Sequence, residues 1–146
     1  MGASDVIIRD VRVKVSDSNQ KSTGSMGLAS CNQSIIDHCS ISWATDKGFN
    51  SRSAQNITFP WNIIGESFHD SVHYDAGDLN NSETLAFMAS IIRYTRSFHH
   101  NLLINNAGRN WSLAGAMEQD TVTYGGQLDI RNNVVYNWRD RTTNGS

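Results

Sequence analysis

A short pattern of apolar and asparagine residues recurs along this chain of 146 residues and limits its possible folds more than any other feature. The pattern reads apolar, any, apolar, any, any, small or Asn, any, apolar, and the fourth copy lacks the first apolar residue. Loops of different lengths separate the copies, and a constant core with variable insertions is typical of solenoid proteins. The copies are Val6/Ile8/Val11/Val13, Ser34/Ile36/Cys39/Ile41, Ile57/Phe59/Asn62/Ile64, Arg96/Phe98/Asn101/Leu103 and Leu128/Ile130/Asn133/Val135.

Each copy predicts a strand, a tight bend and a second strand, because alternating positions point to one face before the phase restarts. Stacked copies would place Asn62, Asn101 and Asn133 above one another, where each amide can hydrogen-bond to the next. Asparagine is also common in isolated turns, but its matched register favours a ladder. Stacking buries a face that no single coil could bury alone. The pattern therefore predicts an all-β chain that folds as a parallel β-helix.

Composition and charge exclude several other classes. The formal net charge is −2 without a long run of one sign, which argues against a general nucleic-acid or anionic-membrane binder. No apolar stretch approaches the roughly 20 residues that span a bilayer, and the N-terminus does not resemble an export signal. We expect one domain over residues 1–146. Cys39 should be a small buried group and Cys31 a free thiol.

Two long insertions, 65–95 and 104–127, separate copies of the pattern. Solenoids place such insertions on one face, which is often the binding face. These segments carry His69, His73, Arg109 and Trp111. Function is therefore expected there.

Three segments resemble the pectate-lyase-like polysaccharide lyases, whose fold is a right-handed parallel β-helix. They are SIIDHCSISWATDKGF (34–49), RSFHHNLLINNAGRN (96–110) and QLDIRNNVVYNW (127–138). The resemblance extends from about Ser4 to Trp138. It implies a secreted or periplasmic protein that acts on pectate or a similar acidic polysaccharide. The five copies of the pattern predict about five coils, and the lack of capping elements suggests a section of a longer β-helix.

The resemblance also implies β-elimination, with an arginine that opens an R-x-P-x-x-R motif as the base. Arg109 stands at that place, but Trp111 and Ala114 replace the proline and the second arginine. Tryptophan offers a flat face on which a sugar ring can stack. Trp111 and its neighbour Asn110 are therefore predicted to bind substrate.

The calcium ligands of the family are poorly matched. In the segment 45–50 only Asp46 is acidic, and Lys47 follows it. Calcium takes six to eight oxygen ligands, several of them anionic. Either the substrate supplies most ligands to calcium at Asp46, or Lys47 holds the uronate carboxylate in place of the metal.

The identity of the base is open between two residue types. Arginine is essentially always protonated at neutral pH, whereas an imidazole such as His69 or His73 accepts a proton readily. In the family-based assignment Arg109 is the base. In the alternative, His69 is the base and Arg109 binds the carboxylate or stabilises the enediolate.

Other histidines favour structural roles. Asp37-His38 should belong to a polar network at a bend. A metal pair at His99-His100 is disfavoured, because adjacent strand residues point to opposite faces. His69 and His73 have the spacing of a zinc-peptidase helix, but Asp70 stands where that motif needs glutamate.

A non-catalytic β-helix segment that binds glycan, or that only stacks, is the alternative to a lyase. A five-coil piece without caps would expose strand edges and apolar interior at both ends. We therefore also expect self-association through these ends, with acidic polysaccharide as the substrate and neither nucleic acid nor membrane as a partner.

Overall fold

The computed structural model describes residues 2–16, 18, 23–51, 54–68, 95–106, 110–113, 127–139 and 142–145. All fourteen elements in these ranges are β-strands. Within the same ranges no helix is long and apolar enough to cross a membrane. The expectation of an all-β chain is confirmed for this part of the sequence.

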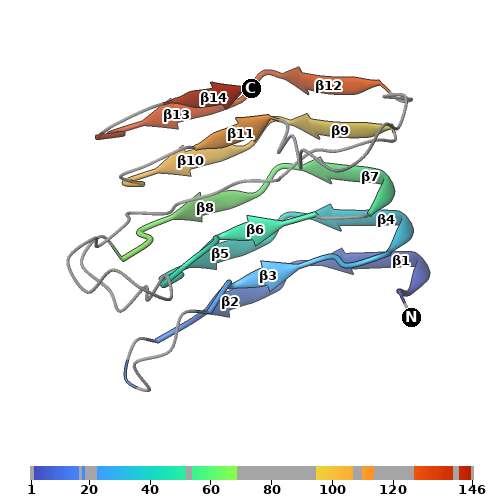
Figure 1. The fold of residues 1–146 in the computed structure, drawn as a ribbon, viewed down its shortest axis with the longest axis horizontal. Helices are drawn as coiled ribbons and strands as arrows, with labels where there is room; N and C mark the ends of the chain where they lie inside the picture. The colour runs from blue at the N-terminus through green and yellow to red at the C-terminus, as the bar shows by residue number, and fades with distance from the viewer. Residues whose placement is uncertain are drawn as a thin grey trace, which may run out of the picture.

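The strands form two parallel five-stranded sheets, and two pairs of short parallel strands accompany them (Figure 1). Sheet A contains, in spatial order, β1 (Ser4–Arg9), β4 (Asn32–Asp37), β7 (Gln55–Pro60), β9 (Arg96–His99) and β12 (Leu128–Arg131). Sheet B contains β2 (Arg12–Lys14), β5 (Ser40–Ser42), β8 (Ile63–Gly65), β10 (Leu102–Ile104) and β13 (Val134–Tyr136). The short pairs are β3 (Met26–Gly27) with β6 (Phe49–Asn50), and β11 (Trp111–Leu113) with β14 (Thr143–Gly145).

Strand register follows the sequence pattern. In sheet A, Phe98 pairs with Phe59 on one side and Ile130 on the other. In sheet B, Ile64 pairs with both Ile41 and Leu103. Each repeated position therefore lies beside its equivalent in the next coil, and the arrangement is consistent with a parallel β-helix.

The core lies between the sheets and contains the apolar positions of the pattern. Phe59 lies between Phe49 and Phe98, with ring centroids 4.3 Å and 5.8 Å away. Trp111 packs edge-on against Phe98 at 5.7 Å. These aromatic side chains come from three separate sheets, so they join the sheets into one apolar interior.

The asparagine ladder is confirmed at the bend between sheets A and B. The Asn62 and Asn101 backbone amides donate to the side-chain oxygens of Asn101 and Asn133, at 2.8 Å and 2.9 Å. The Asn62 side chain accepts from the Cys39 amide at 2.7 Å. Each rung satisfies polar groups that the bend would otherwise bury without partners.

Arg96 fills an apolar position of the pattern with a charged side chain. It is buried, and its guanidinium donates to the Ala54 carbonyl at 3.1 Å and to Ser51 Oγ at 3.2 Å. Burial lowers the pKa of Arg96 to about 10. Hydrogen bonds to neutral oxygens therefore compensate a guanidinium inside the solenoid.

The residue before each rung of the ladder has left-handed backbone geometry. His38, Trp61, His100 and Asn132 have φ values of 51°, 56°, 57° and 51°. This geometry overturns the expectation that His99 and His100 point to opposite faces, because strand alternation ends at the left-handed residue. Their Nδ1 atoms lie 2.9 Å apart.

Asp37 and His38 form the expected polar network. Asp37 accepts from Arg9 Nε at 2.8 Å, and His38 Nδ1 lies 2.5 Å from its other oxygen. Burial alone would raise the pKa of Asp37, but hydrogen bonds and charges from His38 and Arg9 hold that pKa below its ordinary value. Cys39 is buried, and Cys31 is a half-exposed free thiol as expected.

Candidate functional site

Four strands of sheet B are each followed directly by a residue with left-handed backbone geometry. Because the strands are parallel, the loops that follow these residues start at the same edge of the sheet. Trp43, Glu66, Asn105 and Asn137 have φ values of 62°, 56°, 56° and 51°. Trp43 Nε1 donates to Glu66 at 3.0 Å, and the Asn137 amide donates to Asn105 at 2.8 Å. Because the same turn is repeated in each coil, side chains at the next positions gather at one edge of sheet B.

Asn106 connects neighbouring coils at this edge and also contacts Asn110, which follows residues 107–109. Its side-chain amide donates to the Ile64 carbonyl at 3.1 Å and to Asn110 Oδ1 at 3.3 Å. The Ser67 backbone amide lies 3.5 Å from Asn106 Oδ1. Asn106 and Asn110 are both 1% exposed. They therefore fix the two ends of the short segment that carries Arg109.

Trp111 and Asn110 lie in the interior, whereas the sequence predicted that they bind substrate. Trp111 is 4% exposed and packs against Phe98. A ring in that position has no face available to a sugar. The physical reason is that β11 turns this side chain inward, where a large apolar group gains most from burial. Asn110 holds the chain in place through Asn106.

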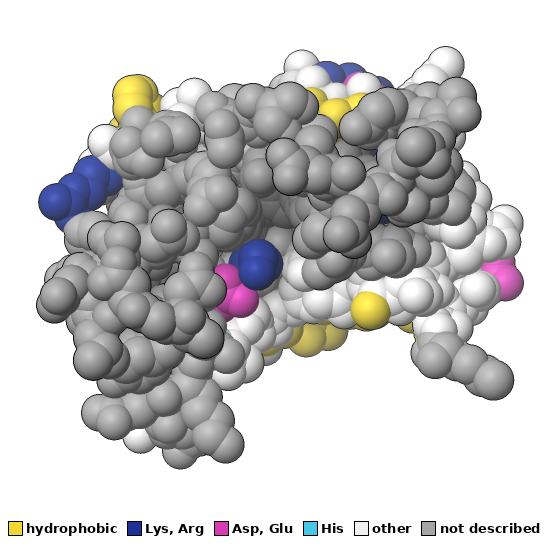
Figure 2. All heavy atoms as spheres, in the orientation of Figure 1, with side chains coloured by type: hydrophobic (Ala, Val, Ile, Leu, Met, Phe, Trp, Pro, Cys, Tyr) yellow, Lys and Arg dark blue, Asp and Glu magenta, His cyan; other side chains and the backbone are white. Residues whose placement is uncertain are grey.

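Asp46 and Lys47 lie together between β5 and β6. Lys47 Nζ is 3.3 Å from Asp46 Oδ2, and the Lys47 side chain is 37% exposed. The Lys47 carbonyl accepts from the Ser25 amide at 2.9 Å, which fixes the backbone there. Figure 2 shows a basic and an acidic side chain in contact near the centre of the face that it presents.

The described residues do not fit a calcium site at Asp46. Its carboxylate is paired with an ammonium group, whereas calcium needs several anionic oxygens. In the described part of the chain, no group of three or more His, Cys, Asp or Glu side chains could hold a metal ion.

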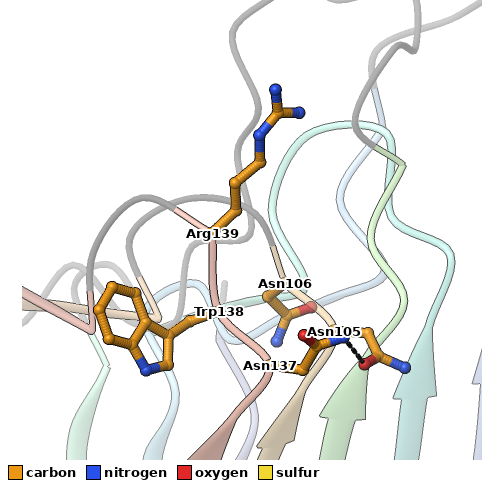
Figure 3. A pocket seen from close by; sticks show the side chains of 5 residues that line it. All are labelled: Asn105, Asn106, Asn137, Trp138 and Arg139. Carbon is orange, nitrogen blue, oxygen red and sulfur yellow. Dashed lines mark hydrogen bonds between the residues drawn. The ribbon is translucent and has the colours of Figure 1, made fainter.

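An open groove of about 410 Å³ lies at the same edge of sheet B (Figure 3). In Figure 3 the Trp138 indole and the Asn105–Asn137 pair lie on opposite sides of Asn106, and the Arg139 side chain extends away from them. Trp138 is 49% exposed. The lining residues are Asn105, Asn106, Asn137, Trp138 and Arg139.

The groove offers three kinds of contact to a ligand. An exposed indole can stack on an apolar ring face, a guanidinium can bind a carboxylate, and the asparagine amides can donate to or accept from hydroxyl groups. Trp138 follows the left-handed Asn137, and its indole is exposed in the groove lining.

The predicted catalytic residues Arg109, His69 and His73 lie outside the described residues. The described neighbours nevertheless limit where their segments begin. Phe68 donates its amide to the Ala44 carbonyl at 2.9 Å, and Asn106 lies in the groove lining. The segments that carry His69 and Arg109 therefore both leave the fold at this edge of sheet B.

The chain is similar to several fungal proteins named probable pectate lyase C. It is 30% identical to the one from Neosartorya fischeri and 29% identical to those from Aspergillus fumigatus and Emericella nidulans. Each similarity extends over 137 residues, or 93% of this chain. The chain spans 27% of the length of these relatives.

Two other comparisons found nothing. No family model matches the chain, and no solved structure matches it. The similarity to the fungal proteins named probable pectate lyase C agrees with the motifs in the sequence, and both support a pectate-lyase-like chain.

Proposed function

We propose that this chain is part of a polysaccharide lyase that cleaves an acidic, uronate-containing polysaccharide by β-elimination. The observation that carries the proposal is the similarity to proteins named probable pectate lyase C over 93% of the chain. The similar region includes both the FHHNL segment (98–102) and Arg109. A secreted or periplasmic location goes with this proposal.

The reaction removes a proton and a leaving group from adjacent carbons. A base takes the proton α to the uronate carboxylate, and those electrons form a carbon–carbon double bond as the glycosidic C–O bond breaks. The departing oxygen then takes up a proton. A cation beside the carboxylate acidifies the α proton by stabilising the enediolate.

Arg109 and His69 remain the candidate bases, with His73 as a further imidazole. If Arg109 is the base, turnover should rise toward alkaline pH, and Arg109→Lys should keep some of it. If His69 is the base, the rising limb should lie near pH 6 to 7, about the ordinary imidazole pKa. His69→Ala would then lower kcat by roughly 10² to 10⁴.

Cationic side chains, rather than a protein-built calcium site, are proposed to bind the substrate carboxylates. Lys47 is half-buried beside Asp46, and Arg139 lines the groove. The single carboxylate at Asp46 supports this assignment. We expect a chelator to reduce turnover only modestly, and full loss that calcium restores would contradict the assignment.

Glycan binding without cleavage is the second candidate function. The groove supports it, because Trp138, Arg139 and the asparagine amides are all described and none of them is a candidate base. Mass spectrometry of incubated polygalacturonate, methylated pectin, alginate and glycosaminoglycan separates the two functions. A lyase leaves unsaturated ends that are one water lighter than hydrolysed ends. Binding without such products would reject the proposed activity.

A further inference from the structure

Several asparagines of this chain stand two residues before a serine or threonine, with a residue other than proline between. This arrangement is the acceptor motif for N-linked glycans in secreted proteins. The asparagines are Asn32, Asn56, Asn80, Asn110 and Asn144. Asn80 and Ser146, the last residue of the motif at Asn144, lie outside the described residues. The motifs at Asn32, Asn56 and Asn110 can be compared in the structure.

The fold excludes a glycan at Asn110. Its side chain is 1% exposed, and its Oδ1 accepts from the Asn106 amide at 3.3 Å. Trp111, the middle residue of this motif, is also buried and packs against Phe98. An oligosaccharide cannot be buried there, because its hydroxyl groups would lose their hydrogen bonds to water. A chain that carries a glycan at Asn110 therefore cannot reach this fold.

Asn56 has the opposite environment. It is the second residue of β7 and is exposed, whereas the next residue, Ile57, is buried in the core. The Asn56 side-chain amide donates to Asn32 Oδ1 at 2.9 Å. A glycan replaces one of the two hydrogens on Asn56 Nδ2, and the other hydrogen remains to donate. The folded chain can therefore carry a glycan at Asn56 without burying it.

The fold does not itself require this motif at the start of β7. The second residues of β1 and β4, Asp5 and Gln33, have the same left-handed geometry as Asn56, with φ values of 59° and 52° against 50°. Thr58, which supplies the hydroxyl group of the motif, pairs with Ile35 on one side and with Ser97 on the other. Other side chains therefore serve at both positions, and backbone geometry alone does not explain the motif.

Asn32 is the poorer acceptor of the neighbouring pair. It is half-buried, and its amide oxygen already accepts from Asn56. Because the two amides are in hydrogen-bond contact, bulky groups on both would collide. The pair has room for one glycan, and the difference in exposure assigns that glycan to Asn56.

We propose that Asn56 is an N-glycosylation site and that Asn32 and Asn110 stay unmodified in the folded protein. The donor is an oligosaccharide carried on a lipid diphosphate in the secretory pathway. Asn56 Nδ2 forms a bond to C1 of the first sugar, the bond from C1 to the diphosphate oxygen breaks, and the diphosphate takes up the proton that Nδ2 loses. The similar proteins named above are fungal, and fungi attach such glycans. The inference rests on the proposed secretion and not on the proposed lyase activity.

Secretion of the full chain from yeast behind a cleavable signal tests the proposal. Material from the medium and from the microsomal membranes is treated with peptide-N-glycosidase in heavy-oxygen water. The enzyme converts a glycosylated asparagine into an isotope-labelled aspartate, which mass spectrometry of peptides locates. The label is expected at Asn56, and neither Asn32 nor Asn110 should carry it in folded, secreted material.

Two variants and a matched control make the test specific. Asn56→Gln removes the acceptor but keeps a side chain that Gln33 shows to fit the left-handed geometry, and Thr58→Val removes only the hydroxyl group. Both should lose the label at position 56 and remain folded by circular dichroism, whereas Asn32→Gln should keep the label.

An unmodified Asn56 in the folded wild type would overturn the proposal, as would a label at Asn32 or Asn110 in that material or a label at Asn56 that persists in Thr58→Val. Unsaturated sugar ends are measured separately on the same material. A missing glycan therefore leaves the proposed lyase activity standing, and a missing lyase activity leaves the glycan site standing.

Discussion

Single side chains hold neighbouring coils together at the bend between sheets A and B, and Asn101 contacts the ladder residue on either side of it. Its amide donates to the Phe59 carbonyl at 2.8 Å and to Asn133 Oδ1 at 2.9 Å. Its oxygen accepts from the Asn62 backbone at 2.8 Å. A buried group that loses its partner costs about 1–3 kcal/mol, so replacing Asn101 disturbs several coils at once.

We therefore predict that Asn101→Ala lowers the free energy of unfolding by roughly 2–4 kcal/mol, as measured by urea denaturation. Asn32→Ala is the matched control, because Asn32 makes its side-chain contacts at the surface. The control should change stability by less than about 0.5 kcal/mol. Equal effects of the two substitutions would show that the ladder adds nothing to stability.

The Asp37 carboxylate gives the fold a dependence on acid. Its pKa is held below the ordinary value by His38 and Arg9 in spite of burial, so its stabilising effect is complete above the unfolded pKa of about 3.9. The effect is lost as pH falls through the lower folded pKa.

Asp37→Asn should therefore reduce stability at pH 7 and remove part of the decline that the wild type shows below about pH 4. The measurement is the unfolding free energy from urea titrations at a series of pH values. The exposed Asp5→Asn is the control. A variant whose acid decline equals that of the wild type would contradict a depressed pKa at Asp37.

At the level of the strands, close packing between coils explains one glycine in sheet B. Gly65 in β8 pairs with Ile104 in β10. A methyl group at Gly65 would lie 2.5 Å from the Ile104 carbonyl oxygen and 2.7 Å from its Cγ2. At Gly27 in β3, by contrast, the nearest atom would be the Asn50 oxygen at 3.9 Å.

Gly65→Ala should thus lower the thermal midpoint, because the strands must separate, with a cost of about 1–3 kcal/mol. Gly27→Ala should be tolerated. Thermal unfolding followed by circular dichroism compares the two. A neutral Gly65→Ala would mean that β8 and β10 lie farther apart than described.

The groove at the edge of sheet B is lined by Trp138, which follows β13 and is exposed. Trp138→Ala removes an indole on which a sugar can stack and should weaken binding of polygalacturonate oligomers up to about tenfold. Arg139→Ala should also weaken binding, and its effect should become smaller as the salt concentration rises. Trp61→Ala, at the other edge of sheet B, is the control. Isothermal titration calorimetry measures the affinities, and equal losses for Trp138→Ala and Trp61→Ala would remove the groove as a binding site.

The sequence predicted the strands of sheets A and B down to their register, because inward positions such as Ile36, Phe59 and Leu103 repeat with a fixed spacing. It did not predict the short strands β3, β6, β11 and β14, since two or three residues show no periodicity. Left-handed residues were also missed. Their effect is clearest at His100, where a φ of 57° ends the strand alternation and brings its ring to the same side of the chain as the His99 ring.

The candidate site was predictable only in part. The resemblance led to Asp46 and Lys47, which do lie together. It could not tell that Trp111 faces the core, since an isolated tryptophan after an insertion has no repeated neighbour to fix its direction. Trp138 and Arg139 follow the last strand of the pattern, and only the structure shows that they line a groove together with residues of the preceding coil.

For the molecule as a whole, parallel coils gather loops that are distant in sequence. The segments after Phe68 and Asn106 both start at the edge of sheet B that holds the groove. Similarity to proteins named probable pectate lyase C extends over 93% of the chain. We therefore propose that acidic-sugar binding and β-elimination take place at this edge.

The most direct test is the ultraviolet absorbance of unsaturated sugar ends during incubation of the chain with polygalacturonate and the other acidic polymers. The wild-type chain is expected to give a steady rise with at least one polymer. Arg109→Ala should abolish or strongly reduce the rise, whichever role that residue has. A folded wild-type chain that binds the polymer but gives no rise with any of them, or an Arg109→Ala variant as active as the wild type, would contradict the account.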